Sequence, residues 1–154
     1  MRRSPLLVLL VSLFLVGCGS DDGDDGDSLS KDEFIDRGDT LCRDYEEEAS
    51  GLPDPQTVEE LTALLETASM LTSEFRDDVA ALDPPQGEGE RIHRAFLDAI
   101  DETVVKIDES LAASREGDVE AAGARFDEAS AAASSVDEQL IDYGFDDCAN
   151  GDGS

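Results

Sequence analysis

Apolar residues recur every three or four positions in four stretches of the chain after residue 29. This spacing places them on one face of an α-helix, and no stretch shows the two-residue alternation of a β-strand. The first two helices are predicted at about 30–50 and 57–82. Each opens with a capping box, 30–33 in the first helix and 57–60 in the second, in which a hydroxyl and a carboxylate each satisfy a free backbone N–H.

The third predicted helix carries the apolar residues of 92–111, and two alternatives are open for its start. In one, Asp83 caps a helix that has Pro84 at its first position, where proline is well tolerated. In the other, the glycines of the following "GEGE" sequence delay the helix to about Glu90.

The fourth stretch has the most regular pattern and predicts one helix over 119–143. Its apolar residues alternate between intervals of three and four, which is the a/d pattern of a coiled-coil seam. The seam consists of Val119, Ala122, Phe126, Ala129, Ala133, Val136, Leu140 and Tyr143. Its small alanines are expected to let a neighbouring helix approach closely. Gly144 is expected to end the helix in a left-handed conformation, with Phe145 reaching back to Leu140.

Four amphipathic helices joined by short turns predict an all-α fold, an up-down-up-down four-helix bundle. The bundle is expected to span residues 30–148, followed by a disordered tail at 149–154. The core should be mainly aliphatic, because aromatic residues make up 5% of the chain and tryptophan is absent.

The start of the chain has the pattern of a targeting segment. Two arginines at positions 2 and 3 precede the apolar stretch 6–16, which is too short for a membrane-spanning helix but typical of a secretory signal. The stretch ends in Leu-Val-Gly-Cys at 15–18, which resembles the lipobox of bacterial lipoproteins. That resemblance implies a signal peptide at 1–17, a diacylglyceryl group on Cys18 and anchoring to the outer face of the cell membrane. The alternative is an ordinary signal peptide with a chance cysteine.

Two cysteines remain if Cys18 carries lipid, namely Cys42 and Cys148. In a compartment outside the cytoplasm such a pair is expected to form a disulfide. The five residues 144–148 must then fold back beside the first helix. Two free thiols or a redox pair are the alternatives, and the chain has no Cys-x-x-Cys spacing to favour the redox pair.

Three short sequences resemble small secreted or lipid-anchored helical proteins of high-GC Gram-positive bacteria. They are "TLCRDY" at 40–45, "LDPP" at 82–85 and "YGFDDCAN" at 143–150. The resemblance implies a helical fold with one disulfide. It implies no molecular function, because the motifs are structural.

The chain is strongly acidic, with 39 Asp and Glu against 11 Lys and Arg and a formal net charge of -28. Such a charge repels nucleic acid and anionic membrane surfaces, and it favours weak, non-specific association of cations. Residues 18–29 include the run "SDDGDDGDS" and are expected to form a disordered tether. This run resembles a calcium loop of the EF-hand type poorly, because Gly23 and Asp32 replace two of the usual ligands.

Candidate chemistry is sparse elsewhere in the sequence. Glu90 and His93 have the Glu-x-x-His spacing of di-iron bundles, but such a site needs two motifs and the chain has one histidine. Ile92 and Phe96 define the core side of this helix, so His93 is expected at the surface or at the boundary of the core. Tyr143 is expected in the core, although haem binding by either His93 or Tyr143 is an alternative. No nucleophile elbow or phosphate-binding loop is present. We expect no catalytic residues, no metal site and no cofactor.

Together these features predict a membrane-anchored extracytoplasmic lipoprotein that is not an enzyme. It is expected to act as an interaction or structural module of the cell envelope, with an unidentified envelope protein as its partner. The alternative is an envelope protein that binds a small ligand, a metal or haem between its helices.

Overall fold

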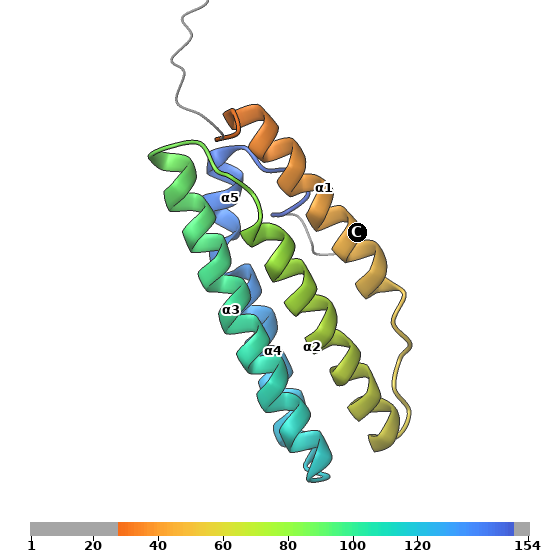
Figure 1. Cartoon of the computed structure of the whole chain (residues 1–154). Helices are drawn as coiled ribbons and strands as arrows, with labels where there is room; N and C mark the ends of the chain where they lie inside the picture. Colours follow the sequence, from red (N-terminus) through yellow and green to blue (C-terminus); the bar gives the residue numbers. More distant parts are fainter. Residues whose placement is uncertain (1–27, 150–154) are drawn as a thin grey trace, which may run out of the picture.

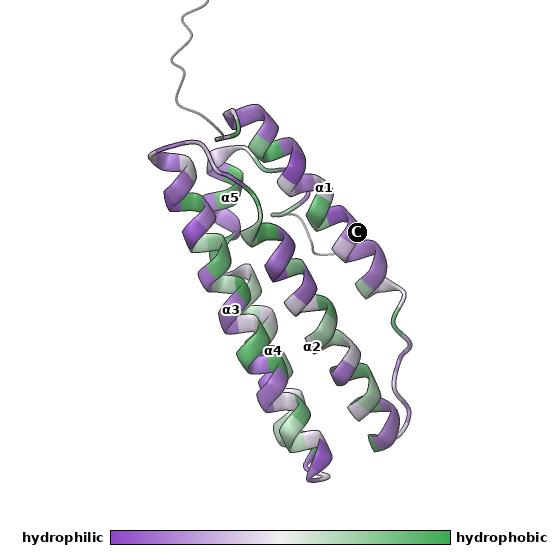
Figure 2. Cartoon of the chain, viewed as in Figure 1, coloured by the Kyte–Doolittle hydropathy of each residue, from purple (hydrophilic) through white to green (hydrophobic). Residues whose placement is uncertain are grey.

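The computed structural model describes residues 28–149, and within this range the fold is all-α, as predicted. The helices are α1 (Lys31–Ser50), α2 (Val58–Ala80), α3 (Glu88–Arg115), α4 (Val119–Ala133), the 3₁₀-helix η1 (Ser134–Val136) and α5 (Asp137–Tyr143). The chain runs up and down the bundle through α1, α2, α3 and α4, and α5 continues the path of α4 towards the end where α1 begins (Figure 1). Hydrophobic and hydrophilic positions alternate around each helix, as expected for amphipathic helices (Figure 2).

Both predicted capping boxes are present. The Glu33 backbone N–H donates to Ser30 Oγ over 3.3 Å, and the Ser30 N–H donates to the Glu33 carboxylate over 3.1 Å. Thr57 and Glu60 exchange the equivalent pair of bonds at the start of α2. These local sequence signals therefore set the first residues of both helices.

The capping box at α1 gives a pH-dependent prediction. The Ser30 hydroxyl, followed by the Ser30 backbone N–H, donates to Glu33 and lowers the pKa of that carboxyl. Because the folded-state pKa is the lower one, this pair stabilises the fold at neutral pH, and the contribution is lost as the pH falls through that pKa. Ser30→Ala should raise the pKa of Glu33 in an NMR titration, and Ser28→Ala, the matched control, should leave it unchanged. An unchanged pKa in Ser30→Ala would contradict this assignment.

The start of α3 agrees with the later of the two alternatives. The helix begins at Glu88, and Gly87 has φ +76°, a conformation that strongly favours glycine. The alternative in which Asp83 caps Pro84 is wrong, because residues 82–85 are non-helical. The Asp83 carbonyl instead accepts a bond from the Leu29 N–H over 2.9 Å, which ties the chain before α1 to the α2–α3 loop.

The prediction of one continuous helix over 119–143 is wrong, because η1 interrupts it. At the break the Ser135 hydroxyl donates to the Ala132 carbonyl over 2.6 Å. Such side-chain bonds compete with the helical backbone pattern. The predicted seam is also only partly buried: Val136, Leu140 and Tyr143 are buried, whereas three predicted core residues of α4 are exposed. Those exposed residues are Val119, Phe126 and Ala133.

The close approach predicted for the alanines of this seam is confirmed at Ala122 and Ala129, whereas Ala133 is exposed and its neighbour Ala132 is buried in its place. Ala122, Ala129 and Ala132 are buried, and α3 and α4 form the most extensive helix pair among the described residues. The Ser110 hydroxyl on α3 donates directly to the Ala122 backbone carbonyl over 2.7 Å. A side chain this short reaches the backbone of a neighbouring helix only where no bulky residue separates the two.

The end of α5 folds as predicted. Gly144 has φ +117°, and the Phe145 N–H donates to the Leu140 carbonyl over 3.0 Å, which together form a Schellman end. Phe145 is 2% exposed and packs edge-on against Phe34, with ring centroids 5.5 Å apart. The turn therefore directs the chain back into the core beside α1.

The disulfide between Cys42 and Cys148 is present, with the two Cα atoms 5.0 Å apart. Nearby hydrogen bonds also hold residues 145–148, here called the returning chain. The Asp39 carboxylate accepts the backbone N–H groups of residues 146–148. Arg43 pairs with Asp147 over 2.6 Å. The predicted return of the chain to the side of α1 is thus confirmed.

Two glycines give a matched pair of stability predictions with opposite signs. Gly38 on α1 lies under the Phe145 ring, and a Cβ at this position would collide with it. Gly38→Ala should lower the free energy of unfolding by about 1–3 kcal/mol. Gly123 on α4 has open space around it, so Gly123→Ala should raise the same free energy by about 0.5–1 kcal/mol through helix propensity. Urea unfolding of both variants measures the difference, and equal signs would refute it.

Candidate functional site

An open groove lies on the side of the bundle where α1 faces α4. Among the described residues α1 packs on α2, α2 on α3, and α3 on α4, but α1 and α4 form no extensive contact. In addition, α1 is too short to cover the whole bundle, because it has 20 residues whereas α3 has 28. Beyond the end of α1, the connecting segment 51–57 runs along α2 on the side that α1 occupies higher up (Figure 1). The groove is therefore floored by α2 and α3.

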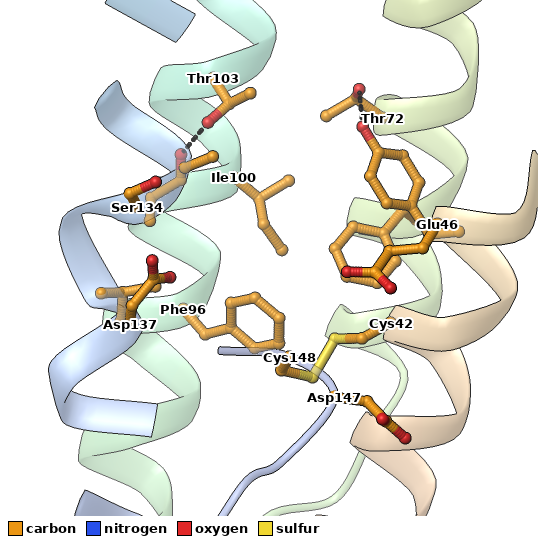
Figure 3. A pocket seen from close by; sticks show the side chains of 15 residues that line it. Cys42, Glu46, Thr72, Phe96, Ile100, Thr103, Ser134, Asp137, Asp147 and Cys148 are labelled. Atoms are coloured by element: carbon orange, nitrogen blue, oxygen red, sulfur yellow. Dashed lines mark hydrogen bonds between the residues drawn. A yellow bond between two sulfur atoms is a disulfide. The ribbon is translucent and has the colours of Figure 1, made fainter. Parts of the chain in front are cut away.

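The upper part of the groove is a pocket of about 190 Å³ next to the disulfide. Its walls come from α1, α2, α3, the η1–α5 segment and the returning chain (Figure 3). Its apolar lining includes Phe75, Phe96, Ala99, Ile100 and Val136. Phe96 and Ile100 lie between the two sides in Figure 3, so the floor of the pocket is apolar.

Tyr45 forms part of one wall of this pocket and is held in place by two neighbours. Its hydroxyl shares a hydrogen bond of 3.0 Å with Thr72, and its ring stacks on Phe75 with centroids 4.7 Å apart. Phe75 in turn packs edge-on against Phe96 at 5.8 Å. These three rings form an aromatic row from the α1 wall to the floor of the pocket.

The lower part of the groove has a volume of about 330 Å³ and continues directly from the upper part. Tyr45, Thr103 and Ala133 line both parts. On one side is the proline-containing segment after α1, and on the other is α4 with Phe126, which is 43% exposed. The exposed seam positions 126 and 133 thus form an edge of the groove.

The charged residues that line the groove are all acidic. They are Glu46 on α1, Asp54 in the α1–α2 segment, Asp137 at the start of α5 and Asp147 in the returning chain. Glu46 and Asp137 stand on opposite sides of the upper pocket (Figure 3). Asp147 is the partner of Arg43, so its charge is compensated locally.

The titratable residues singled out in the sequence lie away from this groove. His93 is half-buried; its Nε2 bonds the Val79 carbonyl at 2.8 Å, and its ring packs edge-on against Phe34. It is a boundary residue, as predicted. Tyr143 is buried in the core, also as predicted, with the Lys31 ammonium 4.3 Å from its ring centroid. Burial and the nearby Glu88 raise the pKa of Tyr143. Neither His93 nor Tyr143 lines the groove.

The remaining sequence-based predictions are only partly covered by the structure. Cys18 and the acidic run at 20–27 lie outside the described residues. Within residues 28–149, no group of three or more His, Cys, Asp or Glu side chains is arranged to hold a metal ion. None of the helices there combines the length and the apolar character needed to cross a membrane.

Sequence reasoning missed the groove, although one signal pointed to it. The apolar seam of residues 119–143 is longer than the first helix, so part of it had no predicted partner across the bundle. Comparisons with protein-family models, with curated proteins and with solved structures found no match to this chain. The groove is therefore interpreted from its own geometry and charge.

Proposed function

We propose that this protein is a lipoprotein anchored to the extracytoplasmic face of a bacterial cell membrane, where it acts as a non-enzymatic interaction module. The interaction role rests on one observation, the apolar, acid-lined groove between α1 and α4. Phe126, which is 43% exposed at the edge of this groove, adds to its accessible apolar surface, and a continuous apolar surface of this kind is typical of an interaction site. The anchor rests on the lipobox resemblance at 15–18.

The position of the first described residues fits this arrangement. The chain enters the bundle at Leu29, beside the α2–α3 loop, and Cys18 lies ten positions before Ser28. A segment of ten residues reaches about 35 Å at most. The end of the bundle that holds the start of α1 would therefore stay near the membrane, with the groove running away from it.

The anchor is tested by mass spectrometry of the protein from the membrane fraction. We expect the first residue to be an acylated Cys18. Cys18→Ala, the matched control, should leave the chain unprocessed and without lipid. An unmodified chain that begins elsewhere would overturn the lipoprotein assignment.

The interaction role is tested by crosslinking in intact cells. We expect the full-length protein to form a covalent complex with a specific envelope protein. If crosslinkers placed around the bundle capture no protein, the interaction module is wrong, whatever the state of Cys18.

A small-ligand binding protein of the envelope is the second candidate. The observation that favours it is the upper pocket, which has an apolar floor and a wall with two stacked aromatic rings. Thermal unfolding separates the two candidates. A rise of the midpoint at a stoichiometric concentration of haemin or of a single metal ion would favour the ligand-binding protein, whereas a dependence on ionic strength alone would count against it.

A further inference from the structure

We propose that the groove between α1 and α4 binds a cationic amphipathic helix from a partner protein. This inference rests on the proposed interaction function and deepens it, because it names the surface and the chemistry of the partner. The shape, the apolar surface and the charge of the groove each fit such a helix.

The shape of the groove matches a helix. Its floor is formed by two neighbouring helices, α2 and α3, and its edges by α1 with the segment 51–57 on one side and by α4 on the other. An additional helix laid along this floor would occupy the place where α1 and α4 would otherwise meet. Amphipathic helices commonly bind in apolar grooves between helices in this way.

The apolar surface is continuous along the groove. Phe96 and Ile100 lie in the upper part, and Leu64, Ile107 and Phe126 in the lower part. Phe126 offers the largest exposed apolar side chain of this surface, since the others are buried or half-buried. A row of apolar residues on one face of a bound helix would cover them all.

The charge of the groove selects a cationic partner. Its lining contains no lysine or arginine and four carboxylates, of which Asp147 is paired with Arg43, and the whole chain carries a formal charge of -28. A field of this sign draws cationic segments towards the surface. It opposes a second copy of this chain and an anionic lipid surface, because both would bring further negative charge to the groove.

The first test uses membrane vesicles that contain the full-length chain with photoreactive benzoylphenylalanine at position 126. The probe is a synthetic 18-residue peptide of leucine and lysine in a helical amphipathic pattern. After illumination we expect a covalent peptide adduct at position 126 that exceeds, by about tenfold, the adduct obtained with the photoreactive residue at position 105. Val105 is an apolar residue of α3 that is 53% exposed, more than Phe126, and it lines neither part of the groove.

Two controls separate specific binding from simple attraction between opposite charges. A scrambled peptide of the same composition should give about tenfold less adduct, because it has the charge without the apolar face. Glu46→Gln with Asp54→Asn should reduce the adduct severalfold, whereas Glu74→Gln with Glu102→Gln, which removes the same charge outside the groove lining, should not. Equal yields for the two peptides, or for the two double variants, would overturn the inference.

The second test uses the same photoreactive positions in intact cells without added peptide. A partner segment that is basic and amphipathic, attached at position 126, supports the inference. Attachment of another copy of this chain, of an acidic segment, or of a protein at position 105 alone would overturn it and leave the interaction module standing. Absence of any protein adduct at either position would overturn both proposals.

Discussion

Replacing Cys42 and Cys148 with serine is expected to lower the free energy of unfolding by about 4–5 kcal/mol, as an upper figure. The disulfide closes a loop with a sequence separation of 106. Opening it frees the unfolded chain to adopt many more conformations, while the folded state loses a bond at the edge of its core. Since small domains are stable by only about 5–15 kcal/mol, the variant should be close to unfolding at physiological temperature.

Urea unfolding of the oxidised protein and of the double-serine variant measures this loss. A reductant should lower the midpoint of the oxidised protein towards that of the variant, and it should leave the variant itself unchanged. Hydrogen exchange should also accelerate at the backbone amides of residues 146–148, which donate to Asp39 in the folded protein. A loss of less than about 1 kcal/mol would contradict this prediction and show that the other contacts of the returning chain, among them the hydrogen bonds to Asp39, hold it without the disulfide.

The parts of the fold that the sequence predicted correctly depend on contacts close in the chain. The capping boxes at residues 30–33 and 57–60 form between residues three positions apart, and the Schellman end at Gly144 forms within one helical turn. The disulfide was predictable because the expected lipidation of Cys18 leaves one pair of cysteines. In each case few alternatives compete with the structure observed.

The groove was not predictable in the same way, because it depends on which helices fail to meet. A periodic seam shows that one face of a helix is apolar, but it does not show that every position on that face has a partner. In α4 the seam positions 122 and 129 are buried, whereas 126 and 133 are exposed and line the groove beside α1. Asp39 was missed for a similar reason, since its partners lie more than 100 positions away.

Two phenylalanines, Phe34 and Phe126, show the difference between an apolar position with packing partners and one without them. Phe34 is fully buried at the start of α1, while Phe126 is 43% exposed at the edge of the groove. The Phe34 ring packs edge-on against three other rings, with centroid distances of 5.9 Å to His93, 6.1 Å to Tyr143 and 5.5 Å to Phe145. These rings come from α1, α3, α5 and the returning chain, so Phe34 joins the elements at the end of the bundle where α1 begins.

Phe34→Ala should therefore lower the free energy of unfolding by about 3–5 kcal/mol, because it removes a buried ring and leaves a cavity among its neighbours. Phe126→Ala is the matched control and should change the same quantity by less than about 1 kcal/mol, because that ring stays 43% exposed in the folded protein and its removal leaves no enclosed cavity. Urea unfolding of both variants, each with the disulfide intact, measures the two values. A loss at Phe126 as large as that at Phe34 would mean that Phe126 belongs to the core in solution, and the groove would then lack its principal exposed contact.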